Sequence, residues 1–125
     1  MTRFVCHCSD CRYLSSSMFM SNFMALDTSI TYLSGRDKLT SWTTNKTIKS
    51  GNDMTNYFCS VCGTLMNRVS SGYPGVSILR IGTVDDPKLA ETKLRPQVEQ
   101  FIENRVRWLE PVKGVERRIE GMFSG

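Results

Sequence analysis

Five cysteines in two close groups are the residues of this chain best suited to chemistry. One group is Cys6-His7-Cys8-Ser9-Asp10-Cys11, and the other is Cys59-Ser60-Val61-Cys62-Gly63. An odd number of cysteines, with no apolar signal core after Met1, argues against a secreted disulfide framework. A redox dithiol of the thioredoxin type needs a strand–helix–strand context that this sequence does not show. The close spacing therefore favours metal binding.

The first group can supply three metal ligands from one short loop. On an extended segment Cys6 and Cys8 share a face, with Cα atoms about 6.6 Å apart. Cys11 returns to the same point if Ser9-Asp10 starts a turn. His7 points to the opposite face, so we do not expect it among the ligands. Three thiolates leave the fourth zinc position open, which is typical of a catalytic zinc. The sequence thus predicts that Cys6, Cys8 and Cys11 act through a bound zinc.

The second group resembles half of a zinc ribbon. Cys59 and Cys62 flank a tight turn, and Gly63 can take the positive φ that such a turn needs. The flanking runs Tyr57-Phe58 and Leu65-Met66 are predicted to be the strands that the turn joins. Two cysteines provide only two of the four ligands of a structural zinc, so partners must come from elsewhere.

One alternative merges the two groups. Cys8, Cys11, Cys59 and Cys62 could form a single four-thiolate structural zinc and leave Cys6 spare. The 47 residues between Cys11 and Cys59 exceed the roughly 15–20 of a compact ribbon, although a long insertion can be accommodated. Metal binding is common to both interpretations, and the number of metal ions is left open.

The elements that must position these cysteines are mostly strands. β-branched and aromatic runs without a helical period predict strands at Ser17–Ala25, Leu39–Thr44, Met54–Phe58, Leu65–Val69 and Val76–Ile81. Short helices are expected after Cys11, near Lys88–Ala90 and near Arg105–Leu109. The recurring turn signals favour a mainly β fold of small antiparallel sheets, as one domain over residues 1–125. We expect the core to include these aromatic residues: Trp42, Trp108, Phe19, Phe23, Tyr57, Phe58 and Phe101.

Composition and charge exclude several classes of protein. The chain of 125 residues is 40% hydrophobic and 22% charged, as in globular domains, and its net charge is +4. No run approaches the ~18 apolar residues of a membrane span. The basic residues are scattered singly, so nucleic-acid binding is not expected. We expect a cytoplasmic protein, with a nuclear location also compatible.

The motifs are similar to those of the glutathione-dependent formaldehyde-activating (GFA) family, which includes centromere protein V. The resemblance is carried by Cys6-His7-Cys8-Ser9-Asp10-Cys11-Arg12, Ser15-Ser16-Ser17-Met18-Phe19 and Phe58-Cys59-Ser60-Val61-Cys62-Gly63-Thr64. It continues through Gly82–Pro87 and Arg105–Leu109, and the stretch from Trp108 to Phe123 is most similar to fungal members.

This resemblance implies a β-tent fold and a zinc cofactor. Cys6, Cys8 and Cys11 match the substrate-facing zinc site of the family, and Cys59 and Cys62 match half of its structural zinc site. The implied activity is condensation of glutathione with formaldehyde to S-hydroxymethylglutathione, classed as a carbon–sulfur lyase. Arg12, or else Arg80, would pair with a glutathione carboxylate, and His7 would either shuttle a proton or serve the structure.

The sequence departs from the family at its start. Family members begin with a strand bearing Cys-x-Cys-Gly, which completes the structural zinc site, whereas here Met1 stands only five residues before Cys6. The chain is thus expected to be N-terminally truncated relative to the family. This departure keeps a second interpretation open: a non-catalytic, zinc-stabilised binding module, or a degenerate member with one merged zinc site. The three cysteines of the first group favour the enzyme.

Overall fold

The computed structural model describes residues 2–121, which divide into two compact units. Unit 1 comprises residues 2–23 and 81–121, and unit 2 comprises residues 24–80. Met122 and Phe123, which contributed to the family resemblance, lie outside the described residues. That residues 1–125 form one domain stays a prediction. Among residues 2–121, none of the helices has the length and apolar character that crossing a bilayer requires.

Unit 2 is built on four antiparallel strands in the order β3-β4-β5-β6. These strands are β3 (Leu39–Thr44), β4 (Met54–Cys59), β5 (Leu65–Ser70) and β6 (Val76–Arg80). All four were predicted within one residue at each end, because each is a β-branched or aromatic run bounded by turn residues. The mainly β prediction is confirmed, and the antiparallel prediction holds throughout this unit.

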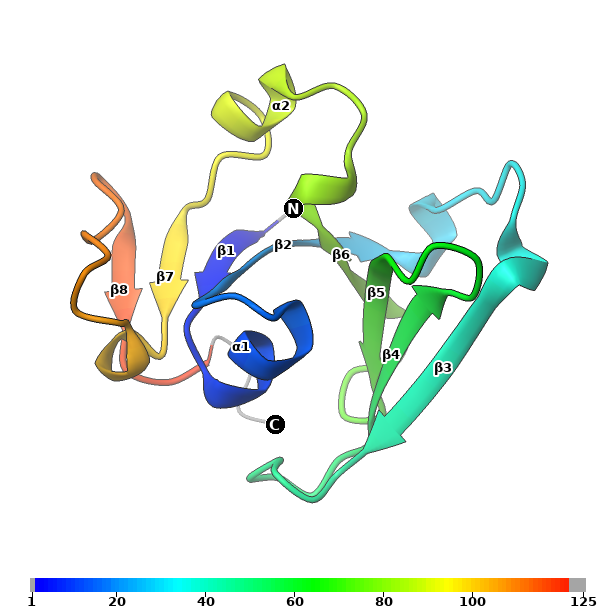
Figure 1. Cartoon of the computed structure of the whole chain (residues 1–125), viewed down its shortest axis with the longest axis horizontal. Helices are drawn as coiled ribbons and strands as arrows, with labels where there is room; N and C mark the ends of the chain where they lie inside the picture. The colour runs from blue at the N-terminus through cyan, green and yellow to red at the C-terminus, as the bar shows by residue number, and fades with distance from the viewer. Residues whose placement is uncertain (1, 122–125) are drawn as a thin grey trace. The chain divides into compact units, whose positions relative to one another are not determined.

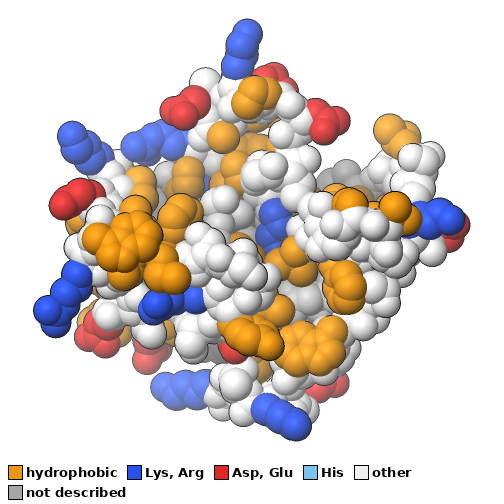
Figure 2. Space-filling model, in the orientation of Figure 1, with side chains coloured by type: hydrophobic (Ala, Val, Ile, Leu, Met, Phe, Trp, Pro, Cys, Tyr) orange, Lys and Arg blue, Asp and Glu red, His pale blue; other side chains and the backbone are white. Residues whose placement is uncertain are grey.

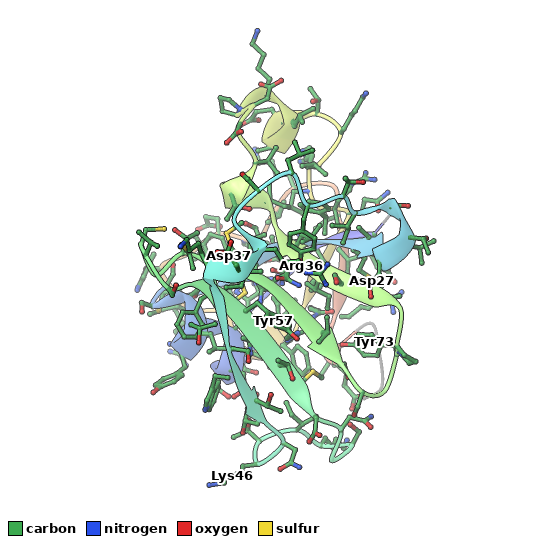
Figure 3. All side chains as sticks on the ribbon, turned by 90° about the vertical axis from the view of Figure 1, so that its right-hand side faces the viewer. Asp27, Arg36, Asp37, Lys46, Tyr57 and Tyr73 are labelled. Carbon is green, nitrogen blue, oxygen red and sulfur yellow. The ribbon has the colours of Figure 1, made fainter. Side chains whose placement is uncertain are left out.

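Short 3-10 helices and loops complete unit 2. The helices are η1 (Asp27–Ser29) and η2 (Arg36–Lys38). Ser77 on β6 donates a hydrogen bond of 2.6 Å to Asp27, which holds η1 against the sheet. Figure 3 shows Arg36 just before β3 and Lys46 in the loop after it, well separated from each other. On the face shown in Figure 2, the Lys and Arg side chains likewise stand in small separate groups rather than in one stripe.

Unit 1 contains the strands that carry the first cysteine group. β1 (Arg3–Cys6) pairs antiparallel with β2 (Met20–Leu26) and parallel with β7 (Val98–Gln100), which pairs parallel with β8 (Glu116–Arg118). In Figure 1, β7 lies between β1 and β8. The parallel pairs were not predicted. All three residues of β7 are buried, including Glu99 and Gln100, so β7 lacks the polar–apolar alternation by which a strand is recognised.

The helices of unit 1 are short. They are α1 (Ser9–Ser15), η3 (Ile81–Thr83), α2 (Lys88–Glu91) and η4 (Ile102–Asn104). The helix predicted near Lys88–Ala90 is confirmed by α2. The helix predicted at Arg105–Leu109 is wrong, because that stretch contains only a turn closed by the Leu109 N–H and the Val106 carbonyl at 3.2 Å.

The buried apolar residues are mostly small aliphatic and sulfur-containing side chains. In unit 1 they are Phe4, Val5, Cys6, Cys11, Met20, Ile81, Leu94 and Val98, and in unit 2 they are Met54 and Ile78. The prediction that Trp42 and Trp108 belong to the core is wrong, since 48% and 73% of their surfaces are exposed. Trp42 lies on β3, which pairs with β4 alone within unit 2, and Trp108 lies in a turn. The other predicted aromatic residues are half-buried.

Candidate metal centre

The three sulfur atoms of Cys6, Cys8 and Cys11 lie within 4.8 Å of one another. Cys6 ends β1, Cys8 is the N-cap of α1, and Cys11 lies in the first turn of that helix. The Sγ atom of Cys8 accepts a hydrogen bond of 3.4 Å from the Cys11 N–H. The turn starts at Ser9-Asp10, as expected, and these are the first residues of helix α1. The sulfur of Cys8 caps this helix in the manner of an N-cap oxygen. The cluster could hold a metal ion.

The chemistry of this donor set fits zinc. Cys6 and Cys11 are 2% and 1% exposed, and Cys8 is half-buried. Soft thiolate ligands select zinc among the common divalent ions, and tetrahedral zinc accepts three protein ligands plus one further group.

The pKa values of the three thiols are shifted in different directions. The pKa of Cys6 is lowered to about 3, because hydrogen bonds from Cys11 and Cys8 stabilise its thiolate against the cost of burial. The pKa of Cys8 is raised: the hydrogen bond from Cys11 lowers it, but the hydrogen bond to Cys6, burial and the charge of Cys6 outweigh that effect. The pKa of Cys11 is raised well above its ordinary value, chiefly by its hydrogen bonds to Cys6 and Cys8. Without metal the cluster therefore concentrates negative charge on Cys6, a buried anion that a cation would neutralise.

His7 lies between two of these cysteines but is engaged elsewhere. Its side chain is fully buried, and its Nε2 atom lies 2.8 Å from Oε1 of Glu99 on β7. The prediction that His7 stays outside the sulfur cluster agrees with the grouping of the three thiols. Complete burial against a carboxylate favours the structural role of His7 over a proton shuttle.

Glu99 is the residue of this region that sequence reasoning missed. Its carboxylate is buried and meets His7, Arg105 at 3.0 Å, the Val112 N–H at 3.2 Å and Arg117 at 3.6 Å. Burial opposes ionisation of Glu99, but hydrogen bonds from Arg105 and His7 outweigh it and hold the pKa of this carboxyl below its ordinary value. Because an ionised carboxylate can only accept, Nε2 of His7 carries the donated proton.

The neighbouring Gln100 also supports the cluster. The β1–β7 register places Gln100 opposite Cys6, and its side chain contributes a hydrogen bond that lowers the pKa of Cys6. Its backbone carbonyl accepts a hydrogen bond of 3.2 Å from the His7 N–H. No sequence motif marks β7 as a strand. The only sequence signal for Glu99 and Gln100 is that two polar residues directly follow the apolar Val98.

Arg12 lies on α1, one residue after Cys11. Its guanidinium donates to the Asn104 carbonyl at 3.3 Å and to Sδ of Met18 at 3.4 Å. Both acceptors are neutral, and among residues 2–121 no ion pair neutralises Arg12. Arg80, the alternative anion partner, lies in unit 2, is buried, and donates to Asn56 at 3.3 Å.

Cys59 and Cys62 lie in unit 2, at the turn between β4 and β5. The turn is closed by two backbone hydrogen bonds, from Gly63 to Cys59 at 2.8 Å and from Cys59 to Thr64 at 2.9 Å. Gly63 has φ +79°, so the predicted positive φ and the predicted strand–turn–strand arrangement are confirmed. Cys62 is exposed, and hydrogen bonds from Thr64 and then from Cys59 lower its pKa. The further ligands required here, and the merged four-thiolate site, stay predictions.

Comparison with protein families identifies the family of this chain. The family model described as glutathione-dependent formaldehyde-activating enzyme matches residues 1–104. No curated protein matches the chain. The matched range contains both cysteine groups, His7 and Glu99, and it ends directly before Arg105.

Proposed function

The chain belongs to the glutathione-dependent formaldehyde-activating enzyme family, and on that premise we propose that it is a zinc-dependent carbon–sulfur lyase. The substrates would be a small thiol such as glutathione and formaldehyde, and the product an S-hydroxymethyl thiol. The observation that carries the proposal is the buried cluster of Cys6, Cys8 and Cys11, whose sulfur atoms lie within 4.8 Å of one another.

The reaction needs a thiol held as thiolate beside an aldehyde. Cys6, Cys8 and Cys11 would hold the zinc ion. When bound, zinc supplies a position at which a substrate thiol is kept deprotonated at neutral pH. In the overall reaction a sulfur–carbon bond forms, the carbonyl π pair moves to oxygen, and the thiol proton ends on that oxygen as a hydroxyl. Burial of Cys6 and Cys11 leaves Cys8 as the ligand nearest to solvent, where substrates arrive.

We propose Arg12 as the residue that binds a glutathione carboxylate. Its two neutral acceptors, Asn104 and Met18, orient the guanidinium without cancelling its charge. A guanidinium has five N–H donors, so a carboxylate can be bound alongside both contacts. Arg12→Met should then raise KM for glutathione and leave kcat nearly unchanged, as loss of uniform binding does.

The substrate thiol also suggests a place for the protein. Glutathione belongs to reducing compartments, and the close spacing of the five cysteines favours metal binding over a secreted disulfide framework. We propose the cytoplasm. The proposed binding partner is a small-molecule thiol such as glutathione.

Exchange NMR on glutathione and formaldehyde, with and without enzyme, tests the proposal. The expected result is that the protein accelerates formation of S-hydroxymethylglutathione above the spontaneous rate, and that Cys6→Ser abolishes the acceleration while retaining the fold by circular dichroism. A Cys6→Ser variant with full activity would contradict the catalytic assignment.

Counting zinc ions by native mass spectrometry separates this proposal from its alternative. Two zinc ions per chain would mean that the buried cluster and the Cys59–Cys62 turn each hold one. A single zinc that survives Cys6→Ser would support the merged, non-catalytic site instead.

A further inference from the structure

We propose that Glu99 is a positioning residue of the Cys6–Cys8–Cys11 centre, and that through Glu99 residues 105–117, which lie beyond the family match, become part of that centre. The inference rests on the proposed metal site and concerns residues that are not themselves ligands. It follows from three features of unit 1. These are the two hydrogen bonds between His7 and β7, the burial of Glu99, and the position in the chain of the residues that contact Glu99.

β7 holds His7 at two points. The His7 N–H donates to the Gln100 carbonyl at 3.2 Å, and its ring nitrogen Nε2 donates to Glu99 at 2.8 Å. His7 stands between Cys6 and Cys8, and in an extended segment successive side chains point to opposite faces. Fixing the His7 ring on one side therefore fixes the directions of the two neighbouring sulfur atoms on the other side. A rotation that freed His7 would turn Cys6 and Cys8 away from their common point.

Glu99 is held in turn by the C-terminal part of unit 1. Its side chain is 1% exposed, and both carboxylate oxygens are used. Oε1 meets His7 and Arg105, while Oε2 meets the Val112 N–H and Arg117. A buried carboxylate is strongly unfavourable unless it is paired and hydrogen-bonded. Three of its four partners come from residues 105–117, so this segment keeps the carboxylate charged and in place.

The chain of contacts thus runs from the C-terminal segment to Glu99, from Glu99 to His7, and from His7 to the two flanking thiols. Residues that orient a metal-binding group from behind it typically change metal affinity by about 10–100-fold when they are replaced. Here the oriented group is the ligand-bearing backbone itself. Loss of Glu99 should therefore weaken metal binding more than the loss of an equal amount of stability elsewhere in unit 1 does.

Cobalt(II) titration of the metal-free chain of residues 1–125 tests this inference. The thiolate-to-cobalt absorption reports ligation at the cysteines directly, without reference to activity. We expect Glu99→Gln to weaken cobalt binding by about tenfold or more. Glu103→Gln makes the same chemical change at an exposed carboxylate four residues away, and it should bind cobalt as the wild type does.

Two further variants separate positioning from general stability. Leu94→Ala removes a buried side chain of unit 1 that has no part in the Glu99 contacts, and it should lower the melting temperature while leaving cobalt affinity unchanged. Arg105→Met and Arg117→Met keep Glu99 but remove its partners at 3.0 and 3.6 Å. They should weaken cobalt binding in that order, and they carry the test if Glu99→Gln does not fold.

The outcomes are distinct. Cobalt binding by the wild type with equal affinity in Glu99→Gln and Arg105→Met would overturn the positioning role and leave the proposed function standing. An equal weakening in Leu94→Ala would show that Glu99 acts only through stability, which also overturns it. A wild type that gives no thiolate–cobalt absorption would overturn the metal centre itself, and the proposed function with it.

Discussion

The two cysteine groups use the same donor atom in opposite settings. Cys6 and Cys11 are almost fully buried, and the contact that orients their loop joins His7 to Glu99, 92 positions away in the sequence. Cys59 and Cys62 lie on a hairpin turn closed by hydrogen bonds within six residues, and Cys62 is exposed. One group is assembled by tertiary contacts, and the other by local backbone geometry.

The two groups also differ in which contacts shift the pKa values of their thiols. In the buried group the three thiols shift one another's pKa values, with Cys6 lowered and Cys8 and Cys11 raised. In the turn, Thr64 and the backbone lower the pKa of Cys62 without any distant contact. The buried cluster should therefore respond to changes at distant residues that reach it through Glu99 and His7, whereas the turn should respond only to changes in its own few residues.

Removing one thiol from each group should give the largest difference in cobalt binding between the two groups. Cys11→Ser takes away one of three ligands at the buried cluster, and we expect cobalt affinity at that site to fall by about a hundredfold or more. Cys62→Ser is the matched change in the turn and should leave the buried cluster able to bind cobalt. An equal loss of the thiolate–cobalt absorption in both variants would instead indicate the merged four-thiolate site.

Alkylation should separate the groups in the metal-free protein. Cys62 is exposed and has a lowered pKa, whereas Cys11 is buried and has a pKa raised well above its ordinary value. Because the thiolate is the nucleophile, iodoacetamide should modify Cys62 at least about tenfold faster than Cys11, as followed by peptide mass spectrometry. Thr64→Val, which removes the 3.1 Å contact to Cys62, should slow Cys62 alone. A faster reaction at Cys11 would contradict the described burial.

Acidification should destabilise unit 1 through Glu99. The pKa of this carboxyl is lowered in the folded protein, so its stabilising effect is present above about pH 4.5 and is lost as the pH falls through its folded-state pKa. At pH 7, Glu99→Gln should cost about 3 kcal/mol, the cost of breaking a buried pair. Urea unfolding of the metal-free proteins at pH 7 and pH 3 measures this. The difference in the free energy of unfolding between wild type and Glu99→Gln should be smaller at pH 3 than at pH 7. An equal difference at both pH values would mean that Glu99 is not ionised.

The stability of the turn should depend on its own backbone conformation. Gly63 has φ +79° and open space around it, so Gly63→Ala introduces no clash but places a side chain in the left-handed region. The expected cost is about 1–2 kcal/mol, measured by thermal unfolding, with buried-cluster cobalt affinity unchanged. Gly82→Ala is the control, since Gly82 also has open space but no positive φ. Equal costs in both variants would argue against strain at Gly63.

Local patterns predicted most of unit 2 and little of the frame around the first cysteine group. The four strands from Leu39 to Arg80 are short runs between turn residues, and each was recognisable by itself. β7 and β8 have three residues each, and β7 is buried on both faces, so neither carries a period that marks a strand. The stretch Arg105–Leu109, near which a helix was predicted, likewise depends on a distant partner, because the Arg105 side chain pairs with Glu99 at 3.0 Å.

The spacing of the cysteines by itself determined that Cys6, Cys8 and Cys11 can converge and that His7 faces away from them, because side chains alternate along an extended chain. It likewise determined the turn at Gly63, whose geometry depends on adjacent residues only. Only the tertiary structure decided that His7 contacts the Glu99 carboxylate. It also decided that residues 105–117 supply the other partners of Glu99. A buried carboxylate is tolerated only where distant donors meet it, and which donors those are depends on the fold.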